Sequence, residues 1–116
     1  MLNSLILVGR LTKEIEVKKT ETGKNVGTLT LAVPRNFKNA EGVYDTDFIN
    51  CTLWEEKARV VKEYCKKGDI VGVKGRLQSN IIKVDENTSK YFLEVVAEKV
   101  SFLSSNKNDF VKNTDK

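Results

Sequence analysis

Hydrophobic and polar residues alternate with a period of two along most of this chain, which is the pattern of β-strands with one buried face. The pattern predicts strands over residues 3–11 (with a continuation or short partner over 15–20), 26–33, 46–54, 70–77 and 91–103. Leu5 to Val8 is apolar at every position, which predicts a strand covered on both faces. Pro34 lacks an N–H donor, so we expect regular strand pairing to weaken there.

One segment, residues 55–67, has a helical period instead. Ala58, Val61 and Cys65 fall at i, i+3 and i+7 and predict the inward stripe of an amphipathic helix. Gly68 is expected to end this helix in the left-handed conformation.

The remaining segments are polar and predict connections. We expect a turn over residues 21–24, a long mobile hairpin loop over 36–45, a polar loop over 78–90 and a disordered tail over 104–116. Three strands, a helix and two strands form the order of an all-β, five-stranded Greek-key OB-fold barrel. The expected organisation is therefore a domain over residues 1–103, with the helix between strands three and four, followed by a short flexible tail.

Composition narrows the function classes. The chain has 116 residues, enough for a single core, and a net charge of +4 that suits a polyanionic partner. It contains no histidine, no phosphate-binding glycine loop and no cysteine pair at metal-ligand spacing, so we expect no catalytic residues, metal or cofactor, and no enzyme. Cys51 and Cys65 are interpreted as small buried hydrophobes with reduced thiols. With no membrane span and no secretory signal evident, the chain is expected in the cytoplasm.

Aromatic residues are the first candidates for function. Phe48 and Trp54 share one parity of their strand, while Ile49, Cys51 and Leu53 supply a complete apolar face on the other. The two rings are therefore expected on the outer side, where they either stack on bases or cover the helix or a subunit contact; the pattern alone leaves both open.

Three further aromatic residues are interpreted from their places in the chain. Phe37, at the start of a polar loop, is a further stacking candidate. Phe92 and Phe102 continue the alternation of the last strand and are expected in the core.

Basic residues spread along the strands could line a groove that follows a sugar-phosphate backbone. Each could equally be a solvated surface charge. The candidates for DNA contact are Arg10, Lys18, Arg35, Lys38, Lys74 and Arg76.

The chain resembles the bacterial single-stranded DNA-binding protein family. The resemblance is carried by Asn3 with Leu5 to Leu11, by Leu29 to Val33, by Asp47 to Cys51 leading to Trp54, by Tyr64 to Gly68 and by Gly75 to Leu77. It implies a homotetramer of OB-folds that binds single-stranded DNA without sequence preference in replication, recombination, repair or DNA uptake. It also implies that Phe37, Phe48 and Trp54 stack on bases.

Two departures from the family pattern qualify this expectation. Where members often carry a further aromatic residue after Gly75-Arg76-Leu77, this chain has aliphatic Ile81 and Ile82, which puts binding through that loop in doubt. The acidic tip that recruits other proteins in the family has no counterpart in the sequence, so tip-dependent recruitment of repair proteins is not expected. Alternatives are an RNA-binding or primosome-type OB-fold protein, or an OB-fold interaction adaptor.

Overall fold

The computed structural model describes residues 1–105 of the chain. The elements are β1 (Leu5–Leu11), β2 (Glu16–Lys19), β3 (Asn25–Lys38), β4 (Tyr44–Trp54), α1 (Glu56–Tyr64), β5 (Ile70–Lys83) and β6 (Ser89–Ser104). Within these residues, no helix is long and apolar enough to cross a membrane.

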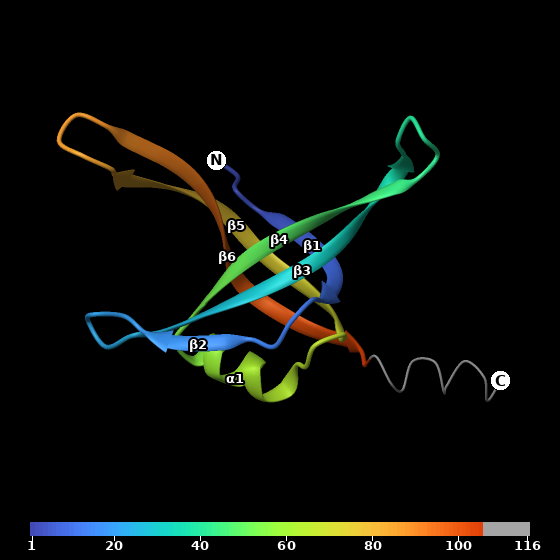
Figure 1. Cartoon of the computed structure of the whole chain (residues 1–116). Coiled ribbons are helices and arrows are strands. Elements are labelled where there is room, and N and C mark those ends of the chain that lie inside the picture. The colour runs from blue at the N-terminus through green and yellow to red at the C-terminus, as the bar shows by residue number, and fades with distance from the viewer. Residues whose placement is uncertain (106–116) are drawn as a thin grey trace.

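The strands form one sheet in the order β1-β5-β6-β4-β3-β2, which closes into a barrel where β1 also pairs with β3 (Figure 1). Closure rests on two residue pairs, Arg10 with Ala32 and Leu11 with Leu31. The predicted OB-fold barrel is confirmed. Because the short strand β2 is separate from β1, the predicted helix is α1, between β4 and β5.

The core is built from the inward parity of the strands and from one face of α1. The predicted stripe of Ala58, Val61 and Cys65 is buried. A Cβ on Gly27 would lie 3.2 Å from the Cβ of Ala58, so a small residue on β3 lets the helix pack closely against that end of the barrel. The largest fully buried side chains are Leu11, Ile15, Leu29, Leu31, Leu53, Val71, Val73 and Cys51.

The helix is shorter than predicted. It ends at Tyr64, and Cys65 already has an extended backbone. The Asp69 carboxylate accepts the Lys66 N–H at 2.8 Å, which replaces the next helical hydrogen bond. Gly68 does adopt a positive φ of 93°, but in the turn after the helix rather than at its end.

Two predicted loops are largely strand. β3 continues through Pro34 to Lys38, with a register shift between those two residues, so the connection to β4 spans only residues 39–43. β5 and β6 pair as far as Lys83 with Ser89, within the expected 78–90 loop. The β3–β4 hairpin and the β5–β6 hairpin both extend as arms from one end of the barrel (Figure 1). These are the β3–β4 arm and the β5–β6 arm, and α1 covers the opposite end of the barrel. Because the arms stand out from the core, their strands need no continuous apolar face, and the sequence signal for strand is weak.

The expectation that Phe92 and Phe102 lie in the core is wrong, since they are 42% and 51% exposed. Phe92 lies on the β5–β6 arm and Phe102 near the end of β6, while Val95 and Ala97 supply the contribution of β6 to the core. Ser104 belongs to β6 rather than to the tail. The rest of the expected disordered tail, from residue 106 onward, lies outside the described part of the chain.

Candidate nucleic-acid interface

The outer face of β3 and β4 carries the first two candidate aromatic residues. Leu29 and Leu31 point into the barrel, so their neighbours along β3 point outward. Phe48 is paired with Ala32 and Trp54 with Val26, and the two rings are 70% and 39% exposed. The predicted outward parity of Phe48 and Trp54 is therefore confirmed.

Phe37 lies farther along the β3–β4 arm, beyond the register shift that follows Pro34, and is 64% exposed. Its neighbour Lys38 places its ammonium 5.8 Å from the ring centroid of Tyr44, a cation–π distance. Tyr44 is an exposed aromatic residue of this arm that sequence reasoning missed. The sequence predicts a loop over residues 36–45, and only the pairing of Lys38 with Tyr44 brings Tyr44 beside the candidate residues.

A hollow of about 250 Å³ lies between the outer face of β4 and the β5–β6 arm. Two hydrogen bonds fix the Glu94 carboxylate at this point: one joins β4 to the arm, and the other lies within the arm, between β5 and β6. The Thr52 hydroxyl donates to Glu94 Oε2 at 2.6 Å, and the Asn80 amide donates to Glu94 Oε1 at 2.6 Å. The hollow is lined by Thr28, Asn50, Thr52, Phe92, Leu93 and Glu94.

Phe92 supplies an aromatic surface on this arm, where the sequence of β5 offers only aliphatic residues. It is paired with Asn80 across the hairpin and lines the hollow beside Thr52. Phe92 on β6 thus lies opposite the β5 segment after Leu77 that lacks the family's further aromatic residue. Only the register of the hairpin places Phe92 there, and the sequence does not reveal this register because it predicts a loop over residues 78–90.

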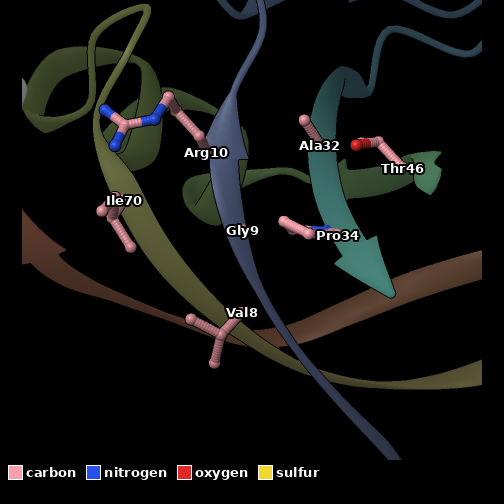
Figure 2. A pocket seen from close by; sticks show the side chains of 7 residues that line it. All are labelled: Val8, Gly9, Arg10, Ala32, Pro34, Thr46 and Ile70. Atoms are coloured by element: carbon pink, nitrogen blue, oxygen red, sulfur yellow. The ribbon is translucent and has the colours of Figure 1, made fainter. Parts of the chain in front are cut away.

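A second hollow, of about 340 Å³, lies where β1 separates from β3, and its lining is mostly apolar. Figure 2 shows β1 passing between β3 and β5, with Ala32, Pro34 and Thr46 on one side and Val8 and Ile70 on the other. A Cβ on Gly9 would lie 2.6 Å from the Ala32 carbonyl oxygen, so only glycine allows this close passage of the strands. Ala32 is the register partner of Phe48, which places this hollow beside the Phe48 ring.

Three of the basic candidates already have polar partners. Arg35 donates from Nη2 to Asp47 at 2.9 Å and lies 3.7 Å from Asp45. Arg76 Nη1 lies 3.4 Å from a carboxylate oxygen of Glu98. Arg10 donates from Nη1 to the Gly68 carbonyl at 2.7 Å, and its side chain extends toward the segment before β5 (Figure 2).

The remaining two lysines lie at different places on the barrel. Lys18 is paired with Val26, and Val26 in turn with Trp54, so the three residues form a row across β2, β3 and β4. Lys74 is paired with Ile6 on one side and Lys99 on the other. The sequence did not separate these positions, because spacing along the chain does not say which strands are neighbours.

The arrangement is that of a barrel with exposed rings on one sheet face and basic residues around it, and the sequence comparisons agree with it. Residues 2–103 match the single-strand binding protein family. The chain belongs to this family.

Known single-stranded DNA-binding proteins align with most of the chain. This chain is 45% identical over 103 residues to single-stranded DNA-binding protein B of Bacillus subtilis, and the alignment covers 89% of this chain and 91% of the relative. It is 47% identical over 109 residues to single-stranded DNA-binding protein 2 of Staphylococcus aureus strain COL, covering 94% of this chain and 78% of the relative. Single-stranded DNA-binding protein 3 of Listeria innocua is 44% identical over 108 residues, covering 93% and 68% respectively.

Proposed function

We propose that this protein binds single-stranded DNA without sequence preference, with bases stacked on Phe37, Phe48 and Trp54. The observation that carries the proposal is the exposure of these three rings on the barrel and its β3–β4 arm, in a chain that belongs to the single-strand binding protein family. Every base has a π-face, so aromatic platforms hold any sequence; each stacked base contributes about 1–3 kcal/mol.

The DNA backbone is held by basic residues around these rings. Lys18 lies in the same cross-strand row as Trp54, so a base on the indole would bring its phosphate near the Lys18 ammonium. Arg10, Lys38, Lys74 and Arg76 extend the positive field along the barrel, while Arg35 acts mainly by fixing the arm that carries Phe37. Binding driven by phosphate neutralisation weakens as salt rises, because counterions are no longer released into a dilute solution.

The functional unit is a homotetramer. Ile6 and Val8 expose apolar side chains on the outer face of β1, while Leu5 and Leu7 pack against the core. An exposed apolar strand face is typical of subunit contacts, and identical subunits close it with symmetry. The tetramer works without catalysis, in the cytoplasm, on the single strands of replication, recombination, repair or DNA uptake.

Intrinsic fluorescence tests the proposal, since Trp54 is the only tryptophan in the chain. Oligothymidine should quench the indole emission and bind tightly, and duplex DNA of the same length should do so much less. An RNA oligonucleotide of matched sequence, titrated in parallel, separates DNA binding from general single-strand binding. Equal affinity for duplex and single strand would overturn the proposal.

A further inference from the structure

We propose that the hollow between β4 and the β5–β6 arm receives one nucleobase that carries an exocyclic amino group, and that Glu94 is the residue that selects it. The inference rests on the proposed single-strand binding. It adds a compositional preference, for cytosine over uracil or thymine, to a surface that is otherwise indifferent to sequence.

The position of the hollow favours a base as its occupant. Thr52 lies two residues from Trp54 on the same outward face of β4, so a strand stacked on the indole passes the opening. Phe92 and Leu93 form an apolar wall, and Phe92 offers a ring on which a base can stack. The volume of about 250 Å³ is below the range of about 300–1,000 Å³ that holds drug-sized ligands, which suits one base.

The polar groups in the hollow present an acceptor at Glu94. Its two carboxylate oxygens accept one hydrogen bond each, from Thr52 and Asn80. An ionised carboxylate has about four acceptor positions, so each oxygen can accept another hydrogen bond. The hydroxyl of Thr52 and the amide of Asn80 are both directed at Glu94, so they hold its carboxylate in a fixed orientation.

A donor lies in the same hollow at Asn50. Its amide oxygen accepts the Thr30 hydroxyl at 2.7 Å, and Asn50 lines the hollow, so its NH₂ group can donate to a base bound there. An acceptor at Glu94 and a donor at Asn50 complement the amino group and adjacent ring nitrogen of cytosine. Uracil and thymine present a carbonyl and an N–H at those positions, so their carbonyl oxygen would face a carboxylate.

A purely structural role for Glu94 gives a different result. If the bond from Thr52 only ties the arm to β4 and the bond from Asn80 only braces the β5–β6 hairpin, loss of Glu94 weakens binding to all sequences alike. The ratio of the affinities for oligo(dC) and oligo(dU), rather than either affinity alone, therefore separates a selective role of Glu94 from a structural one. Glu98 provides a matched control, because it is an acidic residue of the same strand that pairs with Arg76 and does not line the hollow.

The test titrates the full chain with oligo(dC) and oligo(dU) of equal length, at a slightly alkaline pH where cytosine is unprotonated, using the Trp54 signal. The wild type should bind oligo(dC) about five- to tenfold more tightly, the lower part of the range for reading one base. Glu94→Gln should bring the ratio close to one, whereas Glu98→Gln should leave it unchanged. Equal affinities in the wild type, or the same ratio in both variants, would overturn the proposal.

A second arm needs no variant protein. An oligonucleotide of the pyrimidin-2-one nucleoside, which lacks only the 4-amino group of cytosine, should bind the wild type no better than oligo(dU). If it binds as tightly as oligo(dC), the amino group is not what the protein reads and the proposal fails. Failure of the wild type to bind any of these strands would instead overturn the proposed function.

Discussion

Arg35 holds Asp47 across the β3–β4 hairpin. Its Nε lies 3.2 Å from both carboxylate oxygens and its Nη2 lies 2.9 Å from Oδ1. The hydrogen bond and the charge of Arg35 together lower the pKa of Asp47, so this carboxylate stays ionised below the usual range of an aspartate. The arm that carries Phe37 is thus fixed by a cation whose charge is already matched, which makes Arg35 a positioning residue.

Asp47→Asn should remove the carboxylate that neutralises the Arg35 guanidinium. Arg35 would then add to the positive field next to Phe48, so single-stranded DNA should bind more tightly at low salt. The slope of log affinity against log salt should steepen by up to about one. Glu63→Gln on α1 removes a negative charge away from the outer face of β4 and should leave the slope unchanged. An unchanged slope in Asp47→Asn would show that Arg35 does not meet the DNA backbone.

Trp54→Ala should weaken binding by about 1–3 kcal/mol, the value of one stacked base, while Trp54→Phe should cost less because a π-face remains. The indole is only 39% exposed, so part of it packs against neighbouring side chains and a modest loss of thermal stability should accompany the alanine change. Binding isotherms and melting curves of both variants check this. A Trp54→Ala protein that melts far earlier but binds normally would place the ring in a structural role.

Cys51 should make the fold sensitive to alkali. Burial raises the pKa of its thiol from 9.0 to about 11, so the native state keeps the proton that the unfolded chain releases. The contribution to stability, up to about 3 kcal/mol, is complete below pH 9 and is lost as the pH rises toward 11. Denaturant unfolding across this window should therefore show a steeper decline in the wild type than in Cys51→Ala. If the free energy of unfolding declines equally with pH in both proteins, the Cys51 thiol does not cause the alkali sensitivity.

The outer face of β1 should control assembly. Ile6→Glu together with Val8→Glu places two charges on the exposed apolar side of β1 and should shift a tetramer to smaller species in native mass measurements. Val60→Glu changes a half-exposed valine on α1 in the same way and should leave the assembly intact. If the double variant stays tetrameric, the subunit contact lies elsewhere.

The sequence predicted those elements whose pattern is imposed by the core. The alternation in β3 and β4 must place Leu29, Leu31, Cys51 and Leu53 inside, and this alone turns Phe48 outward. The β5–β6 arm lies beyond the core, so nothing forces its residues into a periodic pattern, and the sequence predicts a loop over residues 78–90, which the structure shows to be largely strand. The hollow at Glu94 escaped prediction for a related reason: it depends on the register of Asn80 with Phe92, which brings distant segments together.

The ion pairs could not be predicted from the sequence either. Arg35 and Arg76 look like any surface cations in the chain, and only cross-strand geometry places Asp47 and Glu98 within reach of them. Side-chain partners that come from different strands require the pairing register, which a period of two leaves undetermined.

The central claim, that exposed rings on the outer face of β4 bind single-stranded DNA, is tested most directly by comparing two aromatic residues of nearly equal exposure. Phe48 on β4 is 70% exposed and Tyr64 on α1 is 68% exposed. Affinities for oligothymidine should be measured for Phe48→Ala and Tyr64→Ala, after melting curves establish that both proteins fold. We expect Phe48→Ala to lose roughly five- to a hundredfold in affinity, the equivalent of one stacked base, and Tyr64→Ala to bind as the wild type does. Equal affinities for the two variants, or a larger loss in Tyr64→Ala, would contradict the account.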